Sequence, residues 1–593
     1  MFMVMARDAE TVSDGAMPAA FPVTFEGTVG WFAPARDIAK PVAVLFASPW
    51  GLEEMCSRKF FRILSERLAA MGVANLRFDY PGTGDALSDD GATAGFQAWV
   101  DSFSIAAGQL RKLSGCKRIV VVGQGIGAAV AIKAIEAGED CEAIALLAPV
   151  VSGRLYAREM SAMAQMINEK LRIARAPADG GGLTMAGLSM SEGLFDDIRK
   201  IELGKVMACP VGHALVFARA ERPSDGAFAK HLAALGVDVS EAPFDGYAKL
   251  TTNPTVAVVP DAVVRDLMKW VADICPDGVP ARELKLEPEP AAPHGDDKFV
   301  EQPIRFGKGG RMLGIVCRPS FATTKSLVPV ILLSSGYDRM SGWGRSSARL
   351  ARALAQQGII SFRFDCANVA DSPPVPGLNE QVLYDVAQLD DVSAALDFLG
   401  EQLPGTRFVV AGRCSGAYVG LQAAWRDDRI TAVVAVNPEV FEWQAGRSVE
   451  DALDNPTQSM DHYVSNLWRI STGKRILRGE IDLLAKARQV SKSLVRRFSR
   501  PLVWPTGGMT RRERIVCAGF RVLARRRVKV TLLYSPGDIG LEEFGHFFGA
   551  GGRQLSRFAD MNYAVVSGAD HNFTPEQSRK AYLDAIVEMA SLP

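Results

Sequence analysis

The chain has 593 residues, which is too long for one hydrophobic core, and 48% of them are apolar while 23% are charged. Its basic and acidic side chains balance to a formal net charge of zero, so the composition favours neither nucleic acid nor an anionic membrane as a partner. No run of about 18 apolar residues occurs, and the nine cysteines form no Cys-x-x-Cys pair. We therefore expect a cytoplasmic, multidomain protein with no transmembrane segment, no disulfide framework, no metal and no organic cofactor.

The first half of the chain alternates between predicted strands and helices. An antiparallel hairpin is expected over residues 23–32, and an apolar strand over 42–47 precedes a helix whose inner face carries Leu64 and Leu68. Residues 77–79 form an Arg-Phe-Asp block, with a second aspartate at Asp85, and a strand over 118–122 then enters a glycine-rich turn. This alternation predicts a mostly parallel sheet that helices cover on both faces.

The second half repeats this pattern, with an offset of 286 residues at the Arg-Phe-Asp block. A hairpin is expected over residues 304–318, a strand over 328–333, and a second Arg-Phe-Asp block over 363–365 with its own later aspartate at Asp371. Residues 277–298, rich in Pro, Glu and Asp, read as a linker. We therefore predict two tandem α/β domains, each a mostly parallel, doubly wound sheet with a helical cap insertion, over residues 18–276 and 299–593.

The glycine-rich turn of the second copy carries a candidate nucleophile. Cys414 is the central residue of the Gly-x-nucleophile-x-Gly elbow at 412–416, where a strained turn between strand and helix requires small neighbours. The apolar strands at 528–534 and 563–566 are followed by Asp538 and His571, at the strand ends where such sheets place their sites. We interpret Cys414 as nucleophile, His571 as base and Asp538 as the acid that orients it.

Two further features of this site are expected. The backbone N–H groups of Ser415 and of Tyr337, in the loop after the first parallel strand, would form the oxyanion hole. The acid is the least specific assignment, because three nearby carboxylates could replace Asp538, namely Glu542, Glu543 and Asp570.

The first copy lacks the corresponding groups. Gly125 stands at the nucleophile position, no histidine lies near the equivalent of His571 at 246–247, and Glu221 lies where the acid would be. We therefore predict that the first domain is a pseudo-hydrolase without an active site of its own.

Each copy carries an insertion of helical character that we expect to form a lid, over about 151–208 in the first and about 441–527 in the second. The second insertion is strongly basic, with arginine clusters such as 496–500, 511–512 and 525–527. This excess would suit an acidic partner: coenzyme A phosphates, an acyl carrier protein, an anionic glycan or a membrane surface. A basic surface without a partner remains the alternative.

With these motifs in place, the chain resembles the α/β-hydrolase superfamily twice over. More narrowly, it is similar to the paired hydrolases of exosortase-associated exopolysaccharide gene clusters. The first copy resembles one partner at 48–51 and 76–85, and the second copy resembles the other at 336–338, 342–345 and 413–417. The resemblance implies a hydrolase fold and acyl chemistry in a setting that handles polysaccharide or acyl-carrier intermediates. Cys in place of the usual Ser leaves hydrolysis versus acyl transfer open.

The leading expectation is a hydrolase that cleaves a small-molecule ester or thioester through a covalent acyl-cysteine. The first alternative is an acyltransferase that moves an acyl group from a coenzyme A or carrier-protein thioester to an amine or a sugar hydroxyl. The second is a non-catalytic scaffold.

Overall fold

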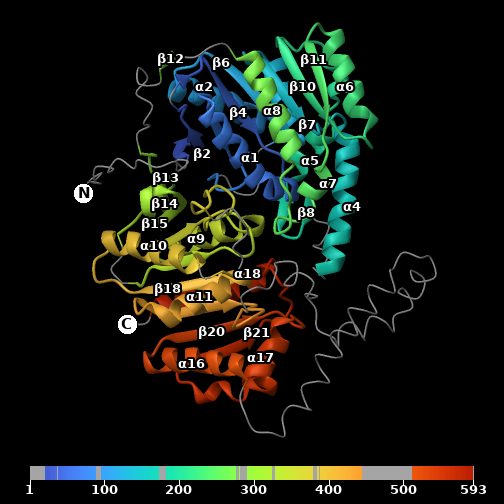
Figure 1. The fold of residues 1–593 in the computed structure, drawn as a ribbon. Coiled ribbons are helices and arrows are strands. Elements are labelled where there is room, and N and C mark those ends of the chain that lie inside the picture. The colour runs from blue at the N-terminus through green and yellow to red at the C-terminus, as the bar shows by residue number, and fades with distance from the viewer. Residues whose placement is uncertain are drawn as a thin grey trace, which may run out of the picture.

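The computed structural model describes residues 20–36, 38–87, 95–171, 182–275, 279–280, 290–322, 327–377, 384–385, 387–443 and 510–591. Two α/β bodies are stacked along the long axis of the molecule, the first in blue to green and the second in yellow to red (Figure 1). Each body is built around its own large sheet. The predicted tandem α/β fold is therefore confirmed.

The first sheet has eight strands among the described residues. In spatial order they are β1 (Phe21–Phe25), β2 (Thr28–Ala33), β5 (Ala74–Phe78), β4 (Val42–Ala47), β6 (Arg118–Gln124), β7 (Ala143–Leu147), β10 (His213–Ala218) and β11 (Asp238–Pro243). The β1–β2 hairpin joins β5 antiparallel, and every pairing from β5 to β11 is parallel. The central strands β4 and β7 are fully buried apolar runs, as a sheet covered on both faces requires.

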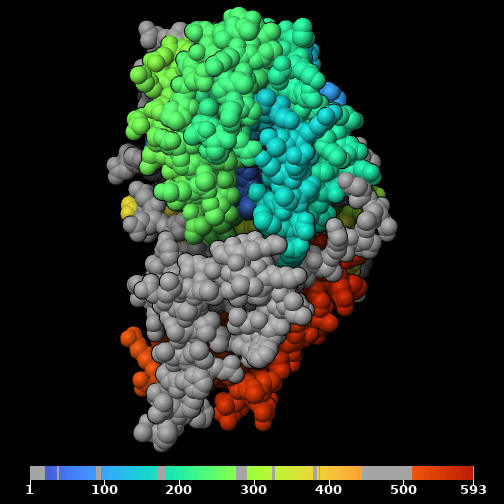
Figure 2. Space-filling view, turned by 90° about the vertical axis from the view of Figure 1, so that its right-hand side faces the viewer, coloured from blue at the N-terminus to red at the C-terminus, as the bar shows by residue number. Residues whose placement is uncertain are grey.

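Helices cover both faces of this sheet. Val42, Val44 and Phe46 of β4 pack with α1 and α8 on one face, while Ala43 and Leu45 pack with α2 and α3 on the other. The helices of the first domain are α1 (Leu52–Ala70), α2 (Phe96–Ser114), α3 (Ile126–Glu136), α4 (Gly153–Leu171), α5 (Glu192–Arg199), α6 (Pro223–Ala234), α7 (Tyr247–Leu250) and α8 (Asp261–Ile274). The first insertion forms α4, α5 and the small hairpin β8 (Leu183–Met185) and β9 (Leu188–Met190). The cyan α4 lies on the surface of this domain (Figure 2).

The second sheet has nine strands among the described residues. In spatial order they are β13 (His294–Gly295), β14 (Phe299–Phe306), β15 (Met312–Pro319), β17 (Ser361–Phe364), β16 (Val330–Leu333), β18 (Phe408–Arg413), β19 (Ile430–Val436), β20 (Lys529–Tyr534) and β21 (Met561–Val565). Apart from the short β13, this order repeats that of the first sheet strand for strand. The repeat in the sequence is therefore a repeat of the whole fold.

The helices of the second domain are α9 (Ser346–Gln356), α10 (Ala387–Gln402), α11 (Ser415–Arg426), α16 (Arg511–Arg525), α17 (Gly540–Phe548) and α18 (Glu576–Ala590). The last part of the expected cap belongs to the core: α16 packs on α11 because Val516, Phe520 and Leu523 form one apolar face. Residues 444–509 of the expected cap lie outside the described residues.

The segment predicted as a linker also makes ordered contacts at both ends. β12 (Val279–Pro280) pairs with β3 (Ile38–Ala39) of the first domain, and β13 pairs with β14 of the second. Residues 276–278 and 281–289 lie outside the described residues. No helix within the described ranges is long and apolar enough to cross a membrane.

The two domains share a small apolar cluster where their first hairpins meet. Trp31 and Val29 of β2 pack there with Leu313 and Ile315 of β15 and with Met340. All five side chains are buried. The domains are therefore joined by core-like packing as well as by the chain.

Candidate active site

Cys414 lies at a strained turn between β18 and α11. Its backbone has φ 51° and ψ −117°, a conformation that residues with a side chain rarely adopt. The elbow is tight: a Cβ atom on Gly412 would lie 2.5 Å from the backbone of Gly416, and one on Gly416 would lie 2.6 Å from Ser334 O. The local packing therefore demands glycine on both sides and presents Cys414 at the start of the helix.

His571 and Asp538 come together beside this turn. His571 Nδ1 lies 2.7 Å from Asp538 Oδ2, and Asp538 is also held by the backbone N–H of Gly540 at 2.8 Å. Burial alone would lower the pKa of His571, but the Asp538 carboxylate and then Cys414 raise that pKa well above its ordinary value. The imidazole is thus oriented by Asp538 and hydrogen-bonded to Cys414.

The three alternative acids lie elsewhere. Asp570 accepts hydrogen bonds from the backbone N–H and the hydroxyl of Thr574, both at 2.7 Å, and so stabilises the turn after the histidine. Glu543 is paired with Arg512, and Glu542 is exposed. Asp538 is therefore the carboxylate that the structure places on His571 Nδ1.

Two residues that the sequence analysis did not identify also face the thiol. Glu439 Oε1 lies 3.9 Å from His571 Nε2, and a carboxylate oxygen of Glu439, the Cys414 sulfur and a His571 ring nitrogen all lie within 4.8 Å of one another. Burial raises the pKa of Glu439. Tyr384 hydrogen-bonds to Cys414. The thiol thus lies among an imidazole, a carboxyl and a phenol.

Cys414, Glu439 and His571 could also hold a metal ion together. Among the described residues, they are the one group of three or more His, Cys, Asp or Glu side chains whose ligand atoms lie close enough to do so. A soft divalent ion such as Zn²⁺ takes sulfur, imidazole and carboxylate ligands. Binding there would occupy the thiolate, so such an ion would block nucleophilic attack by Cys414.

The expected oxyanion loop runs over residues 334–345, directly after β16, and lies against the elbow. The backbone N–H of Gly336 donates to Ser415 Oγ at 2.7 Å, which fixes the start of the loop to the start of α11. Ser415 is the first residue of α11, where helical N–H groups have no partner within the helix. The Tyr337 side chain is buried and lines a small cavity between the two domains.

Arg413 connects this loop with the nucleophile and the histidine. Its Nη2 lies 3.0 Å from Asp338 Oδ2 in the loop, and its Nη1 donates to Asn572 Oδ1, directly after His571. Burial is the main cause that raises the pKa of Asp338 to about 6, although Arg413 opposes it. One guanidinium therefore holds together three segments of the site.

The first domain keeps the elbow but has filled it. Gly125 has φ 56° and ψ −123°, nearly the conformation of Cys414. A Cβ atom there would lie 2.7 Å from Glu53 Oε2. Glu53 accepts hydrogen bonds from Gln124 Nε2 at 3.0 Å and from the Tyr247 hydroxyl at 3.2 Å, and burial raises its pKa. A buried carboxyl group thus stands where the second domain has its thiol.

Two sequence-family models match the chain, one in each domain. Residues 41–186 match the serine aminopeptidase S33 family, and residues 330–585 match the alpha/beta hydrolase family. Both matches fall on the two α/β sheets described above, so the chain contains two α/β-hydrolase-like domains in tandem. The comparison with curated proteins found no match.

Solved structures with detectable similarity include several esterases. A Pyrococcus furiosus esterase is 15% identical, with a TM-score of 0.32, and the match covers 51% of this chain and 96% of that one. Est1E from Butyrivibrio proteoclasticus is 16% identical, with a TM-score of 0.31, and the match covers 43% and 98%. Because these TM-scores are low, the assignment of two α/β-hydrolase-like domains rests on the family models and the sheet topology.

Proposed function

We propose that the second domain cleaves an ester or thioester through a covalent acyl-cysteine on Cys414. The observation that carries this proposal is the continuous path from Cys414 through His571 to Asp538, with the nucleophile on a strained elbow. The sulfur attacks the carbonyl carbon while its proton passes to His571 Nε2. The raised pKa of His571 favours this transfer, because the imidazolium that forms is stabilised by Asp538.

The remaining steps use the same groups. The tetrahedral oxyanion would be stabilised by the N–H groups of Ser415 and Tyr337. Its collapse breaks the bond to the leaving alcohol or thiol, which takes the proton from His571. Water then attacks the acyl-cysteine, gives up a proton to His571, and releases the carboxylic acid and the free thiol. If an amine or a sugar hydroxyl replaces water, the same intermediate gives acyl transfer.

A thioester with a phosphate-bearing carrier is the donor that we propose, because thiolate attack on a thioester exchanges one C–S bond for another. Exposed arginines on and just after α16 support it, since they present positive charge that phosphates would bind. These are Arg511, Arg514, Arg521, Arg525 and Arg527. The narrower resemblance suggests an exopolysaccharide pathway as the setting in which such a donor would be used.

The test is intact-mass spectrometry of the full-length chain after incubation with short acyl thioesters and p-nitrophenyl esters. We expect an acyl adduct on the wild type that is lost with time in water, or faster when an amine acceptor is added. Cys414→Ala should show neither adduct nor turnover. Its stability should stay within about 1–2 kcal/mol of the wild type, because the elbow residue contributes little to packing.

Cys517→Ala is the matched control, because Cys517 is also a partly exposed free cysteine but lies on α16. This variant should acylate like the wild type. An adduct that survives in Cys414→Ala would move the nucleophile elsewhere. No adduct with any donor, together with no preferential alkylation of Cys414 by iodoacetamide, would favour the scaffold alternative.

A further inference from the structure

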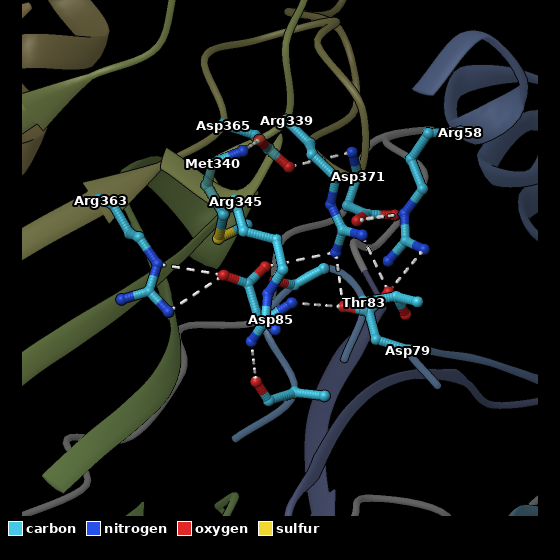
Figure 3. Close-up of polar contacts among 12 residues, drawn as sticks. Arg58, Asp79, Thr83, Asp85, Arg339, Met340, Arg345, Arg363, Asp365 and Asp371 are labelled. Atoms are coloured by element: carbon cyan, nitrogen blue, oxygen red, sulfur yellow. Dashed lines mark hydrogen bonds and ion pairs between the residues drawn. The ribbon is translucent and has the colours of Figure 1, made fainter. Parts of the chain in front are cut away.

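The oxyanion loop of the second domain is anchored in the first domain by a buried arginine. Arg339 donates from Nη1 and Nη2 to both carboxylate oxygens of Asp79, at 2.9 Å and 2.7 Å (Figure 3). It also contacts Glu54 at 3.1 Å and Asp85 at 3.3 Å. Arg339 and Asp79 are 4% and 3% exposed, so this bidentate pair is shielded from solvent.

The neighbouring loop residues are fixed as well. The backbone N–H of Met340 donates to Asp365 Oδ1, and at the end of the loop Arg345 donates to the backbone carbonyls of Gly84 and Ala86. The loop is therefore held by carboxylates on both sides of the domain boundary and by the backbone of the first domain.

A second set of ion pairs surrounds this anchor and reflects the repeat. Arg363 of the second domain pairs with Asp85 of the first at 3.0 Å, while Arg77 of the first pairs with Asp371 of the second. In each copy, the arginine of the Arg-Phe-Asp block thus reaches the later aspartate of the other copy. Arg58 adds a further link to Asp371, at 2.8 Å. Asp85 also contacts Arg339 of the oxyanion loop, whereas Asp371 is bound by Arg77 and Arg58 of the first domain.

Adjacent residues of the loop point in opposite directions. Asp338 contacts Arg413 beside the nucleophile, whereas Arg339 reaches into the first domain. We propose that Arg339 is a positioning residue through which the pseudo-hydrolase domain holds the oxyanion loop of its partner in the catalytic geometry. This assignment rests on the proposed function of Cys414, since it concerns the donor that would stabilise the oxyanion of that reaction. The first domain then acts as a built-in activator.

A structural role alone would predict a different pattern. If the network only docks the domains, loss of any buried arginine should lower stability, and catalysis should fall only through unfolding. If Arg339 positions the loop, its loss should slow acylation while leaving the thiol reactive. Alkylation by iodoacetamide separates the two cases, because it consumes the thiolate without forming an oxyanion.

The experiment compares Arg339→Met with Arg77→Met in the full-length chain. Both variants remove one buried arginine from an ion pair across the same interface, and we expect similar losses of thermal stability. For Arg339→Met we expect the single-turnover acylation rate with p-nitrophenyl acetate to fall on the order of 10²-fold. Alkylation of Cys414 should stay within roughly threefold of the wild type. The acylation rate of Arg77→Met should stay within roughly threefold of the wild-type rate.

A second pair of variants keeps the test independent of folding. Asp79→Asn, in the first domain, keeps the side-chain shape but removes the charge that Arg339 binds, and we expect roughly a tenfold slower acylation. Arg339→Lys keeps the charge without the bidentate contact and should lie between wild type and Arg339→Met. If Arg339→Met does not fold, the acylation rate of Asp79→Asn, compared with that of Arg77→Met, decides whether Arg339 positions the loop.

Three results would overturn the assignment. The first is normal acylation by Arg339→Met and Asp79→Asn, and the second is an equal loss in Arg77→Met. The third is a parallel loss of alkylation and acylation, which would show that the whole site collapses. Failure of the wild type to acylate Cys414 would instead refute the proposed function, and the role of Arg339 with it.

Discussion

Gly125→Ala tests whether Glu53 really fills the vacant elbow of the first domain. The new Cβ would lie 2.7 Å from Glu53 Oε2 and 3.1 Å from the Glu53 carboxyl carbon, so the carboxyl group must move. Moving it breaks the hydrogen bonds to Gln124 and Tyr247, each contributing about 1–1.5 kcal/mol. An alanine at φ 56° adds about 1–3 kcal/mol of backbone strain. We expect Gly125→Ala to lose about 3–6 kcal/mol of stability in total.

The matched variants are Glu53→Ala and the double variant, which together close a thermodynamic cycle. Without the Glu53 carboxyl group, Gly125→Ala costs only the backbone strain. The double variant should therefore be more stable than additivity predicts, by the hydrogen-bond contribution of about 2–3 kcal/mol. Hydrogen exchange in α3 and β6 measures the stability of the first domain by itself, which a two-domain denaturation curve would not.

If the stability losses of the two single variants simply add in the double variant, the steric clash between the new Cβ and Glu53 is refuted. Unchanged hydrogen-exchange protection of α3 in Gly125→Ala would refute it as well. Acylation of Cys414 in both single variants should stay within roughly threefold of the wild type, because neither side chain belongs to the second-domain site.

Two further predictions concern the polar groups around Cys414. Asp538→Asn should lower the pKa of His571, read from its imidazole NMR signals, and slow acylation by at least about 10³-fold. Because the pKa of His571 in the folded chain lies above its ordinary 6.5, the stabilising contribution of the Asp538–His571 pair is fully present below about pH 6.5. It is lost as the pH rises through the folded-state pKa, so the stability gap between wild type and Asp538→Asn should shrink in alkali; a gap that grows would refute the pairing. Glu439→Gln should weaken any inhibition by Zn²⁺ at least tenfold, measured as protection of Cys414 from alkylation, whereas Glu542→Gln, an exposed control, should leave it unchanged.

Most of the fold could be predicted from the sequence because its signals are local. Buried strands such as β4 are continuous apolar runs, and the helix that follows each shows an apolar stripe. The repeat doubled that information, since each weak element in one copy was supported by its equivalent in the other. The end of the expected cap differs for a local reason. The sequence analysis extended the helical insertion to about residue 527, but Val516 and Phe520 form an apolar face of α16 that packs in the core.

The site could be predicted only where a motif defines it. Cys414 stands in an elbow pattern, and His571 follows a late strand, so sequence order alone suggested both. Glu439 follows β19 at the same sheet edge, and this position was the one signal that could have indicated it. Tyr384 has no such signal, because it reaches the thiol from a segment between β17 and α10.

The pairing of Arg339 with Asp79 depends on how the finished domains dock, since it joins residues 260 positions apart. The Arg-Phe-Asp blocks were visible in the sequence, but they indicated only that the copies are related. No pattern within one copy shows that its arginine would pair with the later aspartate of the other. Pairing across the repeat is a property of the interface and needs the structure.

The same position of the repeat has taken opposite roles in the two copies. At the offset of 286 residues that relates Asp79 to Asp365, Glu53 corresponds to Arg339. In the first domain Glu53 turns inward and fills the elbow that Gly125 leaves open. In the second domain Arg339 turns outward and binds Asp79 of the first. Closing one site and anchoring the loop of the other are thus two outcomes at a single position. Exchanging the two side chains should therefore disable the second domain without restoring the first, which still has glycine at its elbow and no histidine at the position equivalent to His571.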